Sequence, residues 1–144
     1  MASAFLLPDP NDPDGQPFWE GTARGELRVQ HCGECDRPRI PPRPMCPWCN
    51  SLRTDWRKVS GNGTIWSFIV PHPPLLPAYA EVAPYNVVVV ALDDDPSLRL
   101  IGNLVSAAGS SINSIDPATI RIGQKVRVVF EQIDDVFLPR WVPS

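Results

Sequence analysis

The order of apolar and polar residues along the chain predicts strands over most of its length. Two segments of alternating character, ELRVQH and TDWRKVS, come first, and a pair of glycines at positions 61 and 63 follows them. Five further segments come after the glycines: GTIWSFIVP, NVVVVALDD, LRLIGNLVS, KVRVVFEQI and FLPRWV. A period of two residues puts alternate side chains on opposite faces of a sheet. We therefore expect a mainly β protein.

The connections between the last five segments indicate how they are arranged. The second and third are joined by DDDPS, in which Pro96 stands where a tight turn favours proline. A longer polar link, SAAGSSINSIDPATIRIG, separates the third from the fourth and contains a capped turn at Asp116 and Pro117. Five short strands with one long link after the third predict a small barrel of the OB-fold type. A fragment of a β-sandwich is the alternative.

A short helix is predicted only near the N-terminus. The stretch GQPFWEGTARGEL has Asp14 in front of it as a candidate N-cap, Pro17 in its first turn and Gly25 as a stop signal. Elsewhere the 18 prolines of the chain disfavour long helices. Phe18 and Trp19 would then face either the protein's own core or a partner.

The four cysteines form two Cys-x-x-Cys pairs, Cys32 with Cys35 and Cys46 with Cys49, with ten residues between the pairs. Each pair places two sulfur atoms on one edge of a tetrahedron, and two pairs complete the coordination that Zn²⁺ prefers. The spacing therefore predicts a zinc ribbon. Because four thiolates fill every coordination position, we expect the metal to hold structure and not to activate water.

Other roles of these cysteines stay open at this point: iron in place of zinc, a metal site that has been lost, or a redox dithiol. A redox pair would need an exposed thiol near a βαβ pattern, and the sequence has no such pattern. His31 directly precedes Cys32, and we interpret it as a strand residue rather than a fifth ligand.

Composition and charge narrow the class of protein. The 144 residues are 43% hydrophobic and 20% charged, which fits one ordinary domain or a small module followed by a compact one. No apolar run approaches the length of a membrane span and the N-terminus has no secretory signal, so we expect a cytoplasmic protein. The net charge of −3 has the wrong sign for a protein that finds nucleic acid through its phosphates.

One segment has the opposite charge. Residues 31–60 carry six basic side chains against three acidic ones. A local basic face on an acidic protein suits a phosphate-bearing small ligand or an acidic protein surface. The alternative is that these arginines offset the negative charge of a four-thiolate metal site.

The sequence contains no complete catalytic set. It has no Gly-rich phosphate loop, no His-Glu-x-x-His motif and no nucleophile elbow, and most carboxylates fall in turns. A proline-stiffened loop from Pro71 to Tyr85 is a candidate partner or substrate-channel surface, with His72, Leu75, Leu76, Tyr79, Val82 and Tyr85 as its contact residues. Tryptophan is enriched at interfaces, although core packing explains most tryptophans. The candidate partner anchors are Phe18, Trp19, Trp48 and Trp141.

Taken in order, these segments resemble one known family. The sequence FWEGTARGEL is followed by CGEC and CPWC, then by SGNGTIWSF, PYNVVVVALD, LRLIGNLV, IRIGQKVRVVFE and a closing LPRW. The chain resembles the acyl-CoA-associated OB-fold family with an N-terminal rubredoxin-like zinc ribbon, known as domain of unknown function thirty-five. The likeness runs from Phe18 to Pro143. It implies an N-terminal extension with a short helix at 1–26, a zinc ribbon at 27–60 and an OB-fold domain at 61–144.

The resemblance also implies a function. It indicates a non-catalytic accessory subunit of a hetero-oligomeric complex, with a thiolase-like aldolase or acyltransferase as partner and in some members a hydratase domain. The complex would act on acyl-CoA, most simply by retro-aldol cleavage of steroid side-chain CoA esters. The family's Zn²⁺ ligands correspond to Cys32, Cys35, Cys46 and Cys49. Within this interpretation Arg37, Arg39 and Arg43 are candidate contacts for the phosphates of coenzyme A.

Two other classes compete with this interpretation. Zinc ribbons and OB barrels also occur in modules that bind single-stranded nucleic acid. The low basic content argues against that class, because the segment from 61 to 120 has one basic residue, Arg99. An independent hydrolase that uses His72 and a nearby carboxylate is the third class, and it has the weakest support in the sequence.

Overall fold

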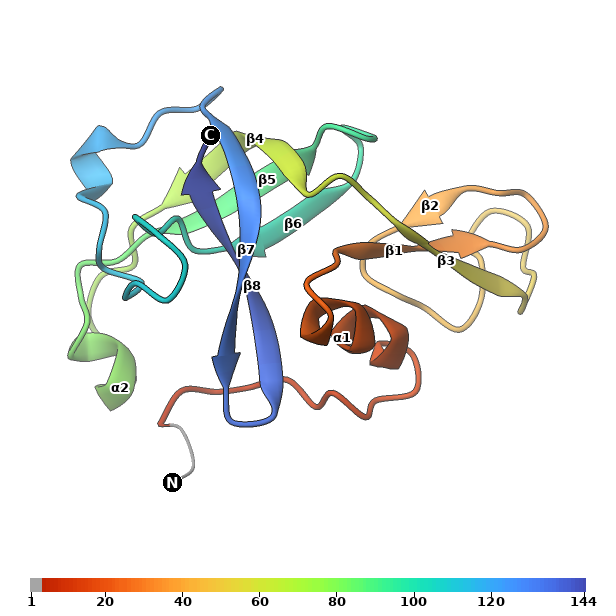
Figure 1. Cartoon of the computed structure of the whole chain (residues 1–144), viewed down its shortest axis with the longest axis horizontal. Coiled ribbons are helices and arrows are strands. Elements are labelled where there is room, and N and C mark those ends of the chain that lie inside the picture. The colour runs from red at the N-terminus through yellow and green to blue at the C-terminus, as the bar shows by residue number, and fades with distance from the viewer. Residues whose placement is uncertain (1–3) are drawn as a thin grey trace.

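A computed structural model describes residues 4–144 and contains two antiparallel sheets with a helix between them (Figure 1). The predicted mainly β fold is confirmed. The longest helix of the described residues, α1, has eight residues, so no helix in this part of the chain is long enough to cross a membrane. In chain order the elements are α1 (Gln16–Ala23), β1 (Arg28–Cys32), β2 (Pro38–Arg39), β3 (Thr54–Lys58), β4 (Asn62–Ile69), α2 (Pro77–Ala80), β5 (Val87–Leu92), β6 (Arg99–Gly102), the 3₁₀ turn η1 (Pro117–Thr119), β7 (Lys125–Ile133) and β8 (Val136–Pro143).

The smaller sheet has the order β2-β1-β3 and carries the cysteine pairs at its end. Strand β1 pairs with β3 over its whole length, from Arg28 opposite Lys58 to Cys32 opposite Thr54. The two-residue strand β2 lies on the other side of β1. The sequence did not predict β2, because a two-residue Pro-Arg strand is too short to show alternation.

The larger sheet has the order β6-β5-β4-β7-β8 and curls until its two ends meet. The segment after β6 closes it: Leu104 forms a parallel bridge to Trp141 in β8, and the Val105 N–H donates to the Trp141 carbonyl oxygen at 2.8 Å. A parallel contact between the third and fifth strands of such a sheet is typical of the OB-fold barrel. The predicted barrel is therefore confirmed, and the sandwich alternative is excluded.

Helix α1 begins and ends for different physical reasons. At its C-terminal end the Glu26 N–H donates to Gly21 O at 2.9 Å, the Gly25 N–H donates to Thr22 O at 3.0 Å, and Gly25 has a φ of 75°. This is a Schellman cap, so Gly25 ends the helix as predicted. The predicted cap at Asp14 is wrong. Gly15 occupies the N-cap position without a side-chain cap, because the backbone there already forms a turn on Asp12 O.

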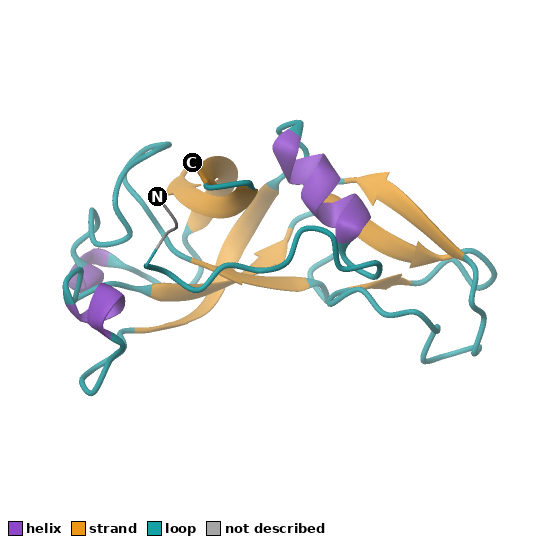
Figure 2. Ribbon diagram, turned by 90° about the horizontal axis from the view of Figure 1, so that it is seen from below, coloured by secondary structure: helices purple, strands orange, loops and turns teal. Residues whose placement is uncertain are grey.

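One core joins the two sheets. Leu27 and Val29, at the start of the small sheet, are buried in the same cluster as Ile65, Val88 and other barrel residues. Helix α1 packs on both β1 and β8, and Figure 2 shows it lying where the two sheets meet. The small sheet is therefore fixed against the barrel by apolar contacts at the start of β1, the end opposite Cys32.

Candidate metal site and arginine recess

The four cysteines converge at the end of the small sheet. Their sulfur atoms all lie within 4.8 Å of one another, and none of the four forms a disulfide. The Cys32 and Cys49 sulfurs are 3.5 Å apart, and those of Cys35 and Cys46 are 3.6 Å apart. Four sulfurs this close, without disulfides, form a site that can hold a metal ion.

The two cysteine turns have the same local build. In each turn the residue after the second cysteine, Asp36 or Asn50, has a left-handed backbone with a φ near 60° (64° and 61°). Asp36 N–H donates to Cys32 O at 3.2 Å, and Asn50 N–H donates to Cys46 O at 2.9 Å. Asp and Asn are the non-glycine residues that tolerate this conformation best. The sequence therefore builds the same tight turn twice around one point.

Backbone N–H groups stabilise negative charge on the sulfurs. The Cys35 N–H at 3.4 Å and the Glu34 N–H at 3.3 Å donate to the Cys32 sulfur, and despite burial they lower the pKa of Cys32 to about 6. Burial opposes the same change at Cys46, but backbone N–H groups outweigh it and lower its pKa. At Cys49 the Ser51 N–H lowers the pKa, yet the neighbouring sulfurs and burial raise it to about 11. The buried sulfurs of Cys32 and Cys46 are therefore stabilised as thiolates, which is the form that binds a metal cation.

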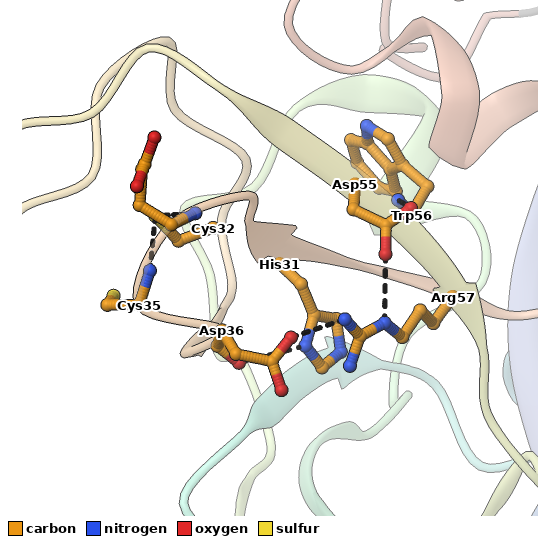
Figure 3. A network of polar contacts seen from close by, with 8 residues as sticks. His31, Cys32, Cys35, Asp36, Asp55, Trp56 and Arg57 are labelled. Carbon is orange, nitrogen blue, oxygen red and sulfur yellow. Dashed lines mark hydrogen bonds and ion pairs between the residues drawn. The ribbon is translucent and has the colours of Figure 1, made fainter.

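Ion pairs brace the outside of the site. Arg57 bonds both Asp36 and Asp55, the latter at 2.9 Å (Figure 3). The hydrogen bond from Arg57 lowers the pKa of the Asp36 carboxyl. His31 contacts the Asp36 carbonyl oxygen with Nδ1 at 3.3 Å and belongs to β1, so it is a strand residue as predicted. These exposed pairs tie the first cysteine turn to β3.

Arg37, Arg39 and Arg43 gather at one recess of about 560 Å³, together with Trp48 and Ser97. Arg37 and Arg43 are exposed, and the Arg37 guanidinium lies 5.4 Å from the centre of the Trp48 ring. Trp48 is 50% exposed. Arg39 differs, because it is only 4% exposed and its Nη2 donates to Arg43 O at 2.9 Å. Arg39 is therefore not open to solvent as Arg37 and Arg43 are, and its contact with a phosphate stays a prediction.

The predicted loop surface is partly occupied by its own chain. Tyr79 stacks edge-on against Phe5 at 5.0 Å and lies 6.0 Å from the Tyr85 ring. Tyr85 is only 7% exposed, so its predicted role in contacting a partner is wrong. Leu76 is exposed, and His72 is exposed with Nδ1 2.7 Å from Val70 O. Leu75, Tyr79 and Val82 are half-buried.

The predicted aromatic anchors separate into three cases. Trp141 is completely buried in the barrel core, so the prediction that it anchors a partner is wrong. Phe18 and Trp19 are half-buried, contact each other at 4.8 Å and line a cavity beside α1. Trp48 stays exposed. Alternation alone could not have identified Trp141 as inward-facing, because its neighbour Val142 is buried as well.

One exposed group was missed by the sequence reasoning. Trp66, Ile69 and Ile101 are 51%, 61% and 66% exposed on the outer face of β4, β5 and β6. The Arg99 guanidinium lies 3.7 Å above the Trp66 ring. Trp66 sits at a β-bulge, between Ile65 and Ser67 in the pairing with β5, and the bulge breaks the simple alternation. An apolar outer face is the signal that was available, since every second residue of β5 is valine or alanine.

The fold and the site define a class: a rubredoxin-like zinc ribbon followed by an OB-fold domain. Two family models match the chain, "ChsH2, rubredoxin-like zinc ribbon domain" over residues 19–54 and "ChsH2, C-terminal OB-fold domain" over residues 56–131. The chain therefore belongs to the ChsH2 family of DUF35 proteins.

Similar proteins carry related names. The chain is 31% identical over 99% of its length to the 3-oxo-4,17-pregnadiene-20-carboxyl-CoA hydratase alpha subunit of Mycobacterium tuberculosis. It spans less than half the length of the hydratase subunits it matches, 45% of this one. It is 30% identical over 76% of its length to a DUF35 domain-containing scaffold protein of Methanothermobacter thermautotrophicus, of which it covers 75%. Among solved structures, a chain of the Ltp2-ChsH2(DUF35) aldolase matches with a TM-score of 0.78 and 32% identity, over 94% of this chain and 98% of that one.

Proposed function

We propose that this chain is a non-catalytic accessory subunit of a complex that processes acyl-CoA thioesters with a thiolase-like partner. Its role is to bind the partner and to help position the CoA thioester. The observation that carries the proposal is the agreement with the ChsH2 chain of a solved aldolase, over nearly the whole length of both chains. The partner we favour is an aldolase that cleaves steroid side-chain CoA esters, with a thiolase or acyltransferase as the second choice.

Co-expression with a thiolase-like aldolase tests the proposal. We expect the two proteins to elute together in gel filtration and the partner's C–C cleavage of a CoA ester to depend on this chain. The proposal is refuted if the chain elutes alone and leaves the partner's activity unchanged. Turnover of a thioester by the isolated chain would also refute it.

We further propose zinc as the metal at the four cysteines. Ligands bound at 2.3 Å to a tetrahedral zinc lie about 3.8 Å apart, which is close to the two sulfur separations of 3.5 and 3.6 Å. The thiolates of Cys32, Cys35, Cys46 and Cys49 would hold the ion and leave no position for water. The zinc would supply structural cross-linking. Elemental analysis of the purified chain should find one zinc per chain, and iron in its place would refute this assignment.

The recess beside the zinc ribbon is the place we propose for the phosphates of coenzyme A. Arg37 and Arg43 offer exposed guanidinium groups there, and Trp48 offers a flat apolar surface on which an adenine base can stack. The Arg37→Ala/Arg43→Ala variant should raise the apparent KM for the CoA ester in the complex about tenfold. The Arg24→Ala/Arg127→Ala variant removes the same charge from exposed positions outside the recess. An equal KM for both variants would exclude the recess from this role.

The outer face of β4, β5 and β6 is the surface we propose for the partner. Trp66, Ile69 and Ile101 are each more than half exposed, whereas in the loop from Pro71 to Tyr85 Tyr79 contacts Phe5 and Tyr85 is buried. Exposed apolar faces of this kind are typical of protein interfaces. His72, Leu75, Leu76 and Tyr79 continue to be candidates for a second contact or for a wall of the substrate channel.

A further inference from the structure

A cavity of about 510 Å³ lies where α1, the small sheet and the barrel meet. Its apolar wall includes Phe18, Trp19, Ile40, Trp56 and Leu138. Helix α1 supplies the first two, and strands from both sheets supply most of the rest. The cavity has the size and the mixed lining of a small-molecule site.

Three arginines line this cavity, and two of them already have a carboxylate partner. The Arg28 guanidinium is 3.0 Å from Glu26, and the Arg140 guanidinium is 3.0 Å from Glu131. Arg39 is the third, and within residues 4–144 no carboxylate lies within ion-pair distance of it. Asp12 and Asp14 also line the cavity, but neither forms an ion pair with Arg39, so the charge of Arg39 is the arginine charge without a paired carboxylate.

Arg39 is also the most buried of the three. It is 4% exposed, and its Nε and Nη1 atoms are buried without a hydrogen-bond partner. These two atoms carry most of the N–H donors of the guanidinium, and Nη2 donates to a backbone carbonyl at 2.9 Å. A buried guanidinium cannot lose its proton, so burying it without an acceptor is costly. Arg39 is among the residues that line the cavity, so an acceptor bound there would lie beside its side chain.

We propose that this cavity binds an organic anion whose carboxylate or phosphate oxygens bond Arg39 and whose apolar body packs against Trp19 and Trp56. An oxyanion is the group that best matches guanidinium donors. The apolar lining requires a hydrophobic body, because a small inorganic anion would leave that wall uncovered. This inference does not depend on the proposed accessory function, since it rests on Arg39 and the cavity alone.

A set of eight-carbon probes tests the head group by calorimetric titration of the full chain with its metal. Octanoate and octyl phosphate carry the two oxyanions, whereas octanol and octylamine have the same body with a neutral or a cationic head. We expect at least one of the two anions to bind at least tenfold more tightly than octanol, and octylamine to bind most weakly. Tighter octanoate identifies a carboxylate ligand, and tighter octyl phosphate identifies a phosphate ester. Octanol binding as tightly as both anions, or no binding of any probe, overturns the proposal.

Variants test the residue. Arg39→Met should lower the affinity for the preferred anion at least tenfold, whereas Arg39→Lys should retain part of it. The matched control is Lys125→Met/Asp93→Asn, which removes a paired cation together with its partner outside the cavity and should change the affinity less than twofold. Should Arg39→Met not fold, the side-chain Nε–H resonance of Arg39 in the wild-type chain provides the measurement. It should shift when the anion is added and stay fixed with octanol, and an unmoved resonance overturns the proposal.

Discussion

Replacing Asn86 should destabilise the barrel. Asn86 is completely buried, and its side chain makes two hydrogen bonds to the backbone of one residue, Leu104. Its Nδ2 donates to Leu104 O at 2.9 Å, and its Oδ1 accepts from the Leu104 N–H at 2.7 Å. Leu104 belongs to the segment that closes the barrel against Trp141. The amide of Asn86 therefore takes the place of a neighbouring strand at the closure.

The size of the effect follows from these two bonds. Asn86→Ala leaves a buried N–H and a buried carbonyl without partners, and each unsatisfied group costs about 1–3 kcal/mol. The expected loss is about 2–6 kcal/mol out of a total stability of about 5–15 kcal/mol. At about 3 °C per kcal/mol for a chain of this size, the melting temperature should fall by about 6–18 °C.

Urea unfolding followed by circular dichroism measures the loss, with metal content held equal in both proteins. The midpoint should fall while the slope of the transition stays the same. Asn62→Ala is the control, because Asn62 is an exposed asparagine in β4, and its stability should stay within about 0.5 kcal/mol of wild type. A loss below about 1 kcal/mol for Asn86→Ala would show that the closure does not depend on these bonds.

Three further changes have sharp outcomes. Cys46→Ser removes a completely buried sulfur, so elemental analysis should find less than a tenth of the wild-type metal, and full retention would contradict the four-sulfur site. Gly63→Ala would place a methyl group 2.8 Å from Ala91 O and should cost about 2 kcal/mol in urea unfolding. Gly15→Ala, whose nearest contact would be 3.5 Å away, should cost less, and equal costs would refute the packing argument. Trp66→Ala should reduce co-elution with the thiolase-like partner without lowering the melting temperature, and undiminished co-elution would exclude the outer face as the docking surface.

The metal site could be predicted from sequence because its information is local. Cys32 and Cys35 share one turn and Cys46 and Cys49 share another, so spacing alone fixes each half of the tetrahedron. The strands were predictable for the same reason, since alternation is read within one segment. The burial of Trp141 depends instead on the register of β7 against β8 and on the closing segment, which join residues far apart in the chain.

The arginines show the same limit more clearly. Arg37, Arg39 and Arg43 look equivalent in the sequence, and charge counting treats them alike. Pairing of β2 with β1 places Arg39 opposite Gln30. Of the three arginines, Arg39 is therefore the one that is buried and lines the cavity. No local pattern marks a strand of two residues, so the inward arginine could not be distinguished from Arg37 and Arg43 before the sheet was known.

Gln30 shows how the metal site and the cavity are joined. The Gln30 residue is 3% exposed, and its side-chain amide bonds both backbone polar groups of Arg43. It accepts from the Arg43 N–H at 2.8 Å and donates to Arg43 O at 3.0 Å. Arg43 O also accepts from Arg39, so one carbonyl links the buried cation to the segment that leads to Cys46. A metal ion bound to Cys32 and Cys46 would therefore fix the two ends of the segment 32–46, which contains Arg39. The hydrogen bonds of Gln30 and Arg39 to Arg43 therefore connect the buried cation to the segment that carries the second cysteine pair.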